Sequence, residues 1–416
     1  MKKLLIVAFH FPPMGGSSGG LRSLKFAQYL PEHGWEPTIL TVNPRVYDHL
    51  DPTGLDVVPD SLRIIRAFAL DTKKHMSVRS RYPGFLAKPD RWVSWSIGAI
   101  PAGLHAIRRH RFDAILSTYP IASAVLIALA LNRVSGLPWI ADFRDPMTEE
   151  GYPRDPAIRR AHEWLERHAM NRATRVIYTT NATYRDQVAK YPDLANGKAV
   201  VIPNGYDEVD FEHLPAVLPK PSRTPVRLTH GGVIYSQGRD PGPLFHAIQK
   251  LSRKGSIVSG DLQIELRGSG LDESLSVKIN ELGIGDFVKL LPSIAYRASL
   301  SDAATANGLL ILQGASCDHQ IPAKLYEYLR LGRPIFALTT LKGETATLLR
   351  QTGGATIADI NDSDAIEVAL LRFLQEMRAE SLRGPDPAIV RNYSRHSQAK
   401  QLATCLDDLG INSTNR

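Results

Sequence analysis

Short apolar runs alternate with longer amphipathic stretches along most of the chain, and this alternation predicts the secondary structure. The first instance is an apolar run at Leu4–Phe9, a glycine-rich loop at Gly15–Gly20, an amphipathic stretch at Leu21–Leu30 and a second apolar run at Thr38–Val42. Short continuous apolar runs are typical of strands buried on both faces, and the stretch between them is typical of a helix. This order of elements predicts a βαβ unit of a parallel sheet.

The same rhythm continues through both halves of the chain. Further strands are predicted at Ala114–Ser117, Trp139–Phe143, Arg175–Thr180, Val200–Pro203, Val226–His230, Leu262–Arg267, Val288–Leu291, Gly308–Leu312 and Pro334–Leu338. Further helices are predicted around Ala122–Arg133, Ile158–Arg175, Leu244–Arg253, Glu273–Leu282 and Ser397–Leu409. The pattern therefore predicts an α/β protein with two Rossmann-like parallel sheets.

The length of 416 residues favours two domains, because a single core stops growing at a smaller size. Leu214–Pro225 has four prolines in twelve residues and is interpreted as the interdomain connection. We expect domains at residues 1–205 and 206–390, followed by a C-terminal segment at 391–416. The longest apolar run, Ile121–Leu131, is shorter than the roughly 20 residues that span a bilayer, so it predicts a buried helix.

Composition and charge narrow the functional classes. The first nine residues are interpreted as a strand and not as an export signal, and two cysteines are too few for a disulfide framework, so we expect a cytoplasmic protein. Residues 1–205 carry 27 Lys and Arg against 18 Asp and Glu, whereas residues 206–416 carry 23 against 24. The basic front half makes an acidic partner plausible, such as an anionic membrane surface, a phosphorylated acceptor or nucleic acid, and solvated surface charge is the alternative interpretation.

Two stretches of the front half combine tryptophan with basic residues. Pro89–Arg111 contains Trp92 and Trp95, and Ile158–Arg175 contains Trp164. Such combinations can anchor a protein at an anionic bilayer, which places the protein peripherally on the inner face of the cell membrane. Core tryptophans and a solvated helix face are the alternative interpretation.

The stretch Ile321–Leu338 carries the strongest functional signal. Pro322 suits the first turn of a short helix and Gly332 its C′ position, and a buried strand follows. Lys324 and Glu327 share a face near the helix start, where free N–H groups attract anions. A diphosphate could bind there, with Lys324 adding charge and Glu327 accepting from a hydroxyl. The alternative is an amphipathic helix with an ordinary pair of charges.

The glycine-rich loop at Gly15–Gly20 is a second candidate, because small residues let backbone N–H groups approach a phosphate. It lacks the G-x-G-x-x-G spacing, which disfavours an NAD enzyme. It contains G-x-S-x-G around Ser17, the pattern of a hydrolase nucleophile elbow. Two prolines separate this pattern from the strand, so a hydrolase is also disfavoured.

Six segments together resemble the retaining glycosyltransferases of family 4, which have the GT-B fold of two facing Rossmann-like domains. They are F-H-F-P-P-M-G-G, W-I-A-D-F-R-D-P, I-P-N-G-Y-D, G-G-V-I-Y-S-Q-G-R-D-P, L-R-G-S-G and P-x-K-x-x-E followed by G-x-P. They span nearly the whole chain in the expected order. The first two look most like the branch that builds bacterial surface polysaccharides.

The resemblance implies a donor site in the second domain. The implied nucleotide-sugar ligands of that domain are Gly232, Arg239, Gly268, Asp318, His319, Lys324 and Glu327, and in the first domain Gly15 and Gly16 would shape the loop beside the donor phosphate and the acceptor. Arg239 and Lys324 would neutralise the diphosphate, and Glu327 would hold the ribose hydroxyls. The first acid of the family's E-x7-E motif is replaced by His319, preceded by Asp318, and these two residues are candidates for hexose contacts.

The resemblance also implies catalytic residues in the first domain, at the end of the strand Trp139–Phe143. Arg144 stands where many family 4 enzymes have a histidine, and Asp142 or Asp145 could accept the proton of the attacking hydroxyl. A structural Asp–Arg pair at the strand end is the alternative. No cluster of His, Cys, Asp and Glu has metal-ligand spacing, and the resemblance implies a metal-independent enzyme without a cofactor other than its donor substrate.

The predicted function is transfer of a hexose, with retention of configuration, from a nucleotide diphosphate sugar to a saccharide hydroxyl, on an acceptor linked to a lipid. The donor would lie against the second domain and the acceptor in the first, and the C-terminal helix would pack back on the first domain. A GT-B nucleotide-sugar epimerase and a catalytically silent GT-B binding protein are the alternatives.

Overall fold

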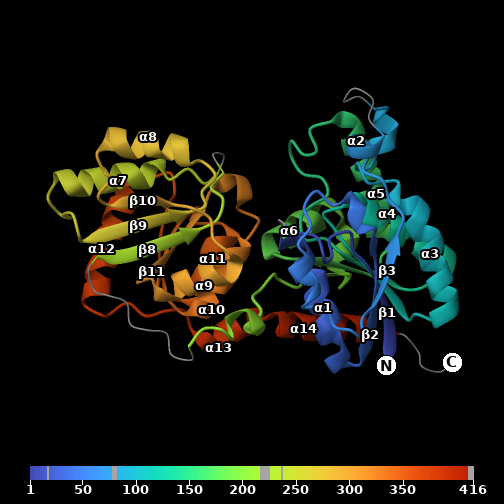
Figure 1. Ribbon diagram of the computed structural model, residues 1–416. Helices are drawn as coiled ribbons and strands as arrows, with labels where there is room; N and C mark the ends of the chain where they lie inside the picture. Colours follow the sequence, from blue (N-terminus) through green and yellow to red (C-terminus); the bar gives the residue numbers. More distant parts are fainter. Residues whose placement is uncertain (16–17, 77–81, 216–224, 236–237, 411–416) are drawn as a thin grey trace. The chain divides into compact units, whose positions relative to one another are not determined.

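The computed structural model describes residues 1–15, 18–76, 82–215, 225–235 and 238–410, and it divides into two compact units (Figure 1). Unit 1 comprises Met1–Pro203 and Arg395–Arg416, and unit 2 comprises Asn204–Ser394. The sequence placed its boundaries at 205/206 and 390/391. Most of the connection expected at Leu214–Pro225 lies outside the described residues.

Unit 1 contains a seven-stranded parallel sheet in the order β3-β2-β1-β4-β5-β6-β7. Its strands are β1 (Lys2–Val7), β2 (Trp35–Val42), β3 (Arg63–Ala67), β4 (Ala114–Thr118), β5 (Trp139–Asp142), β6 (Arg175–Tyr178) and β7 (Ala199–Val201). The sequence analysis did not predict β3. This edge strand is only partly buried and begins with an exposed arginine, so it lacks the apolar run that marks the other strands.

Alternate residues of β1 face two different cores of unit 1. Leu4 and Ile6 belong to the core that contains α1 (Leu21–Tyr29) and α14 (Arg395–Asp407). Leu5 and Val7 belong to the core that contains the helices α3 (Trp95–His110), α4 (Ala122–Ser135) and α5 (Pro156–Arg172). The helix α6 (Asn181–Lys190) follows β6. Because side chains alternate along a strand, both faces of this sheet are covered by helices.

The C-terminal helix α14 is part of unit 1. Its residues Ala399 and Leu402 lie in the same core as Leu4 and Ile6, and α14 packs on α1. At its end, Asp407 accepts hydrogen bonds from Lys2 Nζ at 2.9 Å and Trp35 Nε1 at 3.1 Å. Chain segments from the two ends of the sequence therefore form one unit.

Unit 2 contains a six-stranded parallel sheet in the order β10-β9-β8-β11-β12-β13. Its strands are β8 (Val226–Gly231), β9 (Leu262–Arg267), β10 (Val288–Leu291), β11 (Gly308–Gln313), β12 (Ile335–Thr339) and β13 (Ala355–Ala358). Its helices are α7 (Gly242–Arg253), α8 (Asp272–Leu282), α9 (Tyr296–Thr305), α10 (Ala323–Leu331), α11 (Glu344–Thr352), α12 (Ser363–Arg378) and α13 (Pro387–Val390). One core joins the sheet to α7, α8 and α12, and the other joins it to α9, α10 and α11.

The short helix predicted within Ile321–Leu338 is α10, with one small difference at its start. Pro322 precedes the helix as its N-cap residue with an extended backbone, instead of lying in the first turn. Gly332 ends the helix with φ of +70°, a left-handed conformation that favours glycine. Lys324 and Glu327 therefore lie in the first two turns of α10.

Each sheet reverses its strand order at one place, and such switch points are where open α/β sheets bind ligands. In unit 1 the reversal lies between β1 and β4, and in unit 2 between β8 and β11. The loops that leave the carboxyl ends of these strands are therefore the first places to look for a site.

No helix in the described part of the chain is both long and apolar enough to cross a membrane. The apolar run Ile121–Leu131 forms most of α4, which is largely buried, as predicted. Trp95 is fully buried and Trp92 packs against the same core, so the membrane interpretation was wrong for Trp95. Trp164 on α5 is different, because 48% of its surface is exposed.

Candidate nucleotide-sugar site

The loops after β8 and β11 meet at the switch point of unit 2. The backbone N–H of Gly314, just after β11, donates to the carbonyl oxygen of Gly238 in the loop after β8. Arg239 Nε donates to the side-chain oxygen of Gln313, the last residue of β11, at 3.1 Å. These contacts fix the position of Arg239 beside the ends of both strands.

Lys324 reaches this point from the first turn of α10. Its Nζ atom lies 3.1 Å from His230 Nε2, and a Cβ atom built on Gly232 would lie 3.2 Å from the same Nζ. Gly232 has φ of +103°, a conformation that favours glycine. Because glycine has no Cβ atom, the ammonium group has room beside it. Burial and the charge of Arg239 lower the pKa of Lys324 to about 7, although Glu327 acts in the opposite direction.

Arg239 and Lys324 supply positive charge for which the described residues provide no carboxylate partner. Neither residue forms an ion pair with a carboxylate in the described part of the chain, and the guanidinium of Arg239 lies 5.1 Å from the ring centre of Tyr235. Opposite charge from a ligand would therefore be favourable here. The structure brings together three predicted ligands, namely Gly232, Arg239 and Lys324.

His230 is a residue of this cluster that the sequence analysis missed. It is the penultimate residue of β8, it is 1% exposed, and its Nδ1 atom lies 2.9 Å from the carbonyl oxygen of Leu310. Burial and the charge of Lys324 hold the pKa of His230 well below its usual value. The sequence contained one signal for His230, because this single histidine stands at the end of an apolar strand, directly before Gly231 and Gly232.

Gly268 lies in the neighbouring loop after β9. Its φ is +62°, and its N–H donates to the carbonyl oxygen of Leu291 at 2.8 Å. The N–H of Gly232 donates to the carbonyl oxygen of Arg267, so the loops after β8 and β9 are joined directly. A Cβ atom at position 268 would lie 3.1 Å from the Cβ atom of Ser293. Gly268 thus allows close loop packing beside the cluster.

Glu327 lies one turn after Lys324 on α10. Its Oε1 atom accepts a hydrogen bond from the hydroxyl of Tyr296 at 2.8 Å, and the same hydroxyl lies 3.2 Å from Asp210 Oδ2. Burial and the two carboxylates raise the pKa of Tyr296, so this phenol stays protonated. Glu327 is therefore held at the edge of the cluster by a neutral donor, and its ribose contact stays a prediction.

Asp318 and His319 lie in the loop between β11 and α10. The Asp318 carboxylate accepts a hydrogen bond from the hydroxyl of Thr340, and its backbone oxygen accepts from the N–H of Glu344 at 2.9 Å. Asp318 thus joins this loop to the loop after β12. His319 is partly buried in the same loop. The hexose contacts of both residues stay predictions.

At the switch point of unit 1, Asp142 has a structural contact that the sequence analysis did not predict. Arg22 on α1 donates to both carboxylate oxygens of Asp142, at 2.9 and 3.0 Å, and both side chains are 1% exposed. Arg22 also donates to the carbonyl oxygens of Ile202 and Pro203, and Thr118 donates to Asp142. Both carboxylate oxygens of Asp142 are thus held in a buried ion pair, and its role as a proton acceptor stays a prediction.

Arg144 joins the loops after β1, β4 and β5. It donates to the carbonyl oxygens of Tyr119 and Gly19, both at 2.7 Å, and it does not pair with Asp142. Burial lowers the pKa of Arg144. Asp145 follows it, partly buried, and a catalytic role for either residue stays a prediction.

The loop after β1 brings a further imidazole to this switch point. Burial, and then the charge of Arg144, lower the pKa of His10 to about 4, so His10 is neutral at physiological pH. The N–H of Gly15 donates to the carbonyl oxygen of His49. Gly16 lies outside the described residues. The sequence analysis quoted His10 only as part of a motif and gave it no role.

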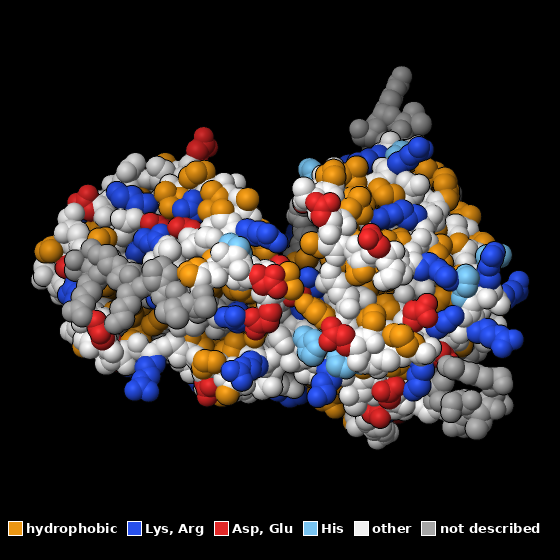
Figure 2. Space-filling model, turned by 60° about the horizontal axis from the view of Figure 1, so that its bottom comes forward, with side chains coloured by type: hydrophobic (Ala, Val, Ile, Leu, Met, Phe, Trp, Pro, Cys, Tyr) orange, Lys and Arg blue, Asp and Glu red, His pale blue; other side chains and the backbone are white. Residues whose placement is uncertain are grey.

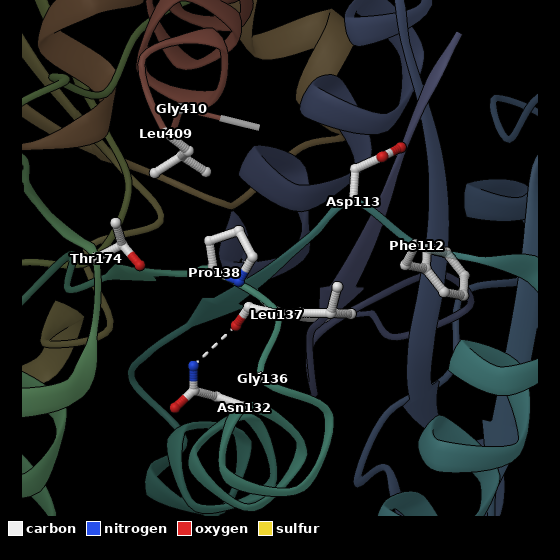
Figure 3. A pocket seen from close by; sticks show the side chains of 9 residues that line it. All are labelled: Phe112, Asp113, Asn132, Gly136, Leu137, Pro138, Thr174, Leu409 and Gly410. Atoms are coloured by element: carbon white, nitrogen blue, oxygen red, sulfur yellow. Dashed lines mark hydrogen bonds between the residues drawn. The ribbon is translucent and has the colours of Figure 1, made fainter. Parts of the chain in front are cut away.

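A separate hollow of about 430 Å³ lies at the opposite edge of the unit 1 sheet (Figure 3). Its lining comes from the residues before β4, β5 and β6 and from the end of the chain, namely Phe112, Asp113, Asn132, Gly136, Leu137, Pro138, Thr174, Leu409 and Gly410. Asn132 donates to the backbone oxygen of Leu137 at 2.8 Å. This hollow is remote from the switch-point loops. As a separate point, the described ranges contain no group of three or more His, Cys, Asp and Glu side chains placed to hold a metal ion.

Comparison with known proteins shows a family for part of the chain. Residues 19–205 match the model of the glycosyl transferase 4-like domain, so unit 1 contains a domain of this family. None of the curated protein sequences matches the chain significantly.

Several solved structures are similar over nearly the whole chain. HepE of Anabaena in complex with UDP and glucose has 14% identity and a TM-score of 0.62, and the match covers 98% of this chain and 100% of that chain. The apo lipopolysaccharide outer core galactosyltransferase WaaB has 13% identity and a TM-score of 0.63, with coverage of 98% and 100%. An enzyme from Listeria monocytogenes, described as a putative UDP-N-acetylglucosamine 2-epimerase, has 12% identity and a TM-score of 0.59, with coverage of 98% and 96%. The chain therefore has the GT-B fold, as predicted.

Proposed function

We propose that the protein is a retaining glycosyltransferase that moves a hexose from a nucleotide diphosphate sugar to a saccharide hydroxyl. The observation that carries this proposal is the pair of cations at the β8–β11 switch point, Lys324 and Arg239, which no carboxylate of the described chain pairs with. The glycosyl transferase 4-like domain in unit 1 favours sugar transfer, and HepE binds UDP and glucose in a fold of the same kind.

In the proposed reaction, these two cations stabilise the leaving group. When the bond between the sugar and the diphosphate breaks, negative charge grows on the diphosphate oxygens. Charge-assisted hydrogen bonds from Lys324 and Arg239 become stronger as that charge grows, and they lower the barrier without a metal ion. Glu327, one turn along α10, would accept from a ribose hydroxyl and orient the nucleotide.

We propose further that the acceptor is a lipid-linked saccharide of surface polysaccharide biosynthesis, reached at the inner face of the cell membrane. The support is the surface of unit 1, where Lys and Arg side chains gather along the edge on which α3 lies (Figure 2). On α3 the exposed residues include Ile97, Arg108 and Arg109. Apolar and basic side chains on one helix suit an anionic bilayer. A vesicle sedimentation assay tests this, with neutral vesicles as the control.

An epimerase is the second candidate, because the similar Listeria protein is described as one. The glycosyl transferase 4-like domain favours transfer over epimerisation. An epimerase would change the sugar of the donor without any acceptor, whereas a transferase releases the nucleoside diphosphate when an acceptor is present. A silent binding protein would bind the donor and release nothing.

The first experiment is a thermal-shift screen of nucleoside diphosphates and their sugars. A ligand that binds only the folded protein raises the melting temperature, by an amount that grows with its concentration over Kd. We expect at least one nucleoside diphosphate to do so and the matching monophosphate to do so less. If none of them raises the melting temperature, the proposed function is wrong. The best donor is then tested for nucleotide release with lipid-linked saccharides.

A further inference from the structure

His230 is a buried polar residue at the centre of the donor site, and its hydrogen bonds define its chemical state. Its Nδ1 atom lies 2.9 Å from the carbonyl oxygen of Leu310, which can only accept. Nδ1 must therefore carry the proton. Because the fully buried ring is neutral, Nε2 has no proton and offers a lone pair.

Among the described residues this lone pair has one donor, the Nζ atom of Lys324 at 3.1 Å. A buried acceptor without a donor is unfavourable, so the contact stabilises the neutral ring as well as the ammonium. Gly232 is also close to the ammonium, because a Cβ atom built there would lie 3.2 Å from Nζ. The flexible lysine thus ends beside both an imidazole and a glycine.

We propose that His230 is a positioning residue, which holds the Lys324 ammonium at the β8–β11 switch point where the donor diphosphate binds. This inference rests on the proposed function and deepens it, because it names the residue that fixes one of the two cations before the ligand arrives. A lysine side chain has several rotatable bonds, and holding it in place beforehand reduces the entropy lost on binding.

The other charged groups around Lys324 cannot replace His230 in this role. Arg239 repels the ammonium and is itself held by Gln313. Glu327 attracts it from the next turn of α10, but its Oε1 atom accepts from Tyr296. Tyr328, which also faces this region, donates no hydrogen bond to Lys324, and its hydroxyl accepts from the N–H of Gly231 at 3.0 Å.

The test compares two substitutions of His230 with a matched control. His230→Phe keeps a ring and removes the acceptor, whereas His230→Gln restores an acceptor close to the position of Nε2. His246→Gln, on the exposed face of α7, is the control. The probe is UDP, titrated calorimetrically, together with any nucleoside diphosphate that the thermal-shift screen identifies.

We expect His230→Phe to weaken diphosphate binding about tenfold, the size expected for a lost charge-assisted hydrogen bond. His230→Gln should stay within about threefold of the wild-type protein, and the control should be unchanged. In turnover assays His230→Phe should raise the KM for the donor more than it lowers kcat. Equal affinity of His230→Phe and the wild-type protein, or equal weakening by Phe and Gln, would overturn the inference.

A spectroscopic measurement keeps the inference testable if His230→Phe does not fold. In protein labelled with ¹⁵N-histidine, His230 should show a protonated Nδ1 and an unprotonated Nε2 in the absence of any nucleotide. Lys324→Met should then move the Nε2 resonance downfield, because the lone pair loses its donor. An unchanged resonance would overturn the positioning role even if nucleotides bind. Failure of the wild-type protein to bind any nucleoside diphosphate would instead overturn the proposed function.

Discussion

The two switch points of this protein have the same topology but use their cations in opposite ways. In unit 1, Arg22 is enclosed by Asp142 and two carbonyl oxygens, and Arg144 donates to two further carbonyl oxygens. In unit 2, Lys324 contacts a neutral imidazole and Arg239 contacts a neutral amide. The cations of unit 1 are therefore satisfied within the protein, whereas the hydrogen-bond partners of the two cations of unit 2 are neutral in the described part of the chain.

The comparison shows that a cation at the carboxyl edge of a sheet is not by itself evidence of an anion site. What distinguishes the two edges is the partner of each cation. A cation whose partner is anionic, or whose N–H groups are all hydrogen-bonded, gains little free energy from binding an anionic ligand. A cation with a neutral partner keeps most of its electrostatic attraction for such a ligand. On this basis we propose that the donor diphosphate binds to unit 2.

The largest expected effect concerns the ion pair of unit 1. Asp142→Ala leaves Arg22 as an unpaired buried charge, and removing one partner of such a pair typically costs about 3–5 kcal/mol of folding stability. Urea denaturation measures this loss, with Asp186→Ala on the exposed surface of α6 as the control. Normal stability of Asp142→Asn together with lost turnover would instead indicate that Asp142 is catalytic.

Lys324→Met should lower the affinity for the diphosphate without lowering the folding stability of unit 2. It should weaken nucleoside diphosphate binding tenfold or more, because a charge-assisted hydrogen bond is lost. The stability of the ligand-free protein should change little at neutral pH, because removing a partly buried cation without an anionic partner offsets the loss of the donor to His230 Nε2. Arg144→Ala is the contrasting variant, and it should reduce turnover more than donor binding. A similar loss of diphosphate affinity in Lys324→Met and Arg144→Ala would contradict the distinction drawn between the sheet edges of unit 1 and unit 2.

Glu327→Ala should weaken nucleotide binding by about tenfold, if its carboxylate accepts from a ribose hydroxyl as predicted. Circular dichroism should show an unchanged fold, because Glu327 is only partly buried. Tyr296→Phe removes the donor that holds Glu327 and should have a smaller effect, about threefold to fivefold. An effect of Tyr296→Phe as large as that of Glu327→Ala would indicate that the tyrosine itself contacts the nucleotide.

Donor binding should also depend on pH, through Lys324. Its pKa of about 7 in the free protein should rise when a diphosphate binds, so the complex takes up a proton above that pH. Affinity for a nucleotide sugar should then be greatest below pH 7 and fall several-fold as the pH rises to 8. Calorimetry in buffers of different ionisation enthalpy measures the uptake, and Lys324→Met should abolish it. Binding without proton uptake at pH 8 would mean that Lys324 is already fully charged.

Most of the fold could be predicted from the sequence, because the buried parallel strands are continuous apolar runs. The residues Leu262–Arg267 and Val288–Leu291 are the strands β9 and β10 as predicted. The strands that the sequence analysis missed are incompletely buried. They are β3, at the edge of its sheet, and β13, which is half buried and follows two glycines. The resemblance to family 4 and the GT-B fold is confirmed, whereas the surface-polysaccharide branch stays a prediction.

The donor side could be predicted further than the catalytic side, for a physical reason. Lys324 and Glu327 are three residues apart on one helix, so their common face follows from helix geometry. The partners of Asp142 and Lys324 are Arg22 and His230, which are 120 and 94 residues away in the sequence. Only the folded sheet brings these pairs together, and no local pattern in the sequence indicates them.

A crystal structure of the protein with bound UDP tests the central claim most directly. We expect the diphosphate oxygens to lie within hydrogen-bond distance of Lys324 Nζ and of the Arg239 guanidinium, with Lys324 still in contact with His230. A diphosphate bound instead by Arg144 at the β1–β4 loops of unit 1 would contradict the assignment of the donor to unit 2.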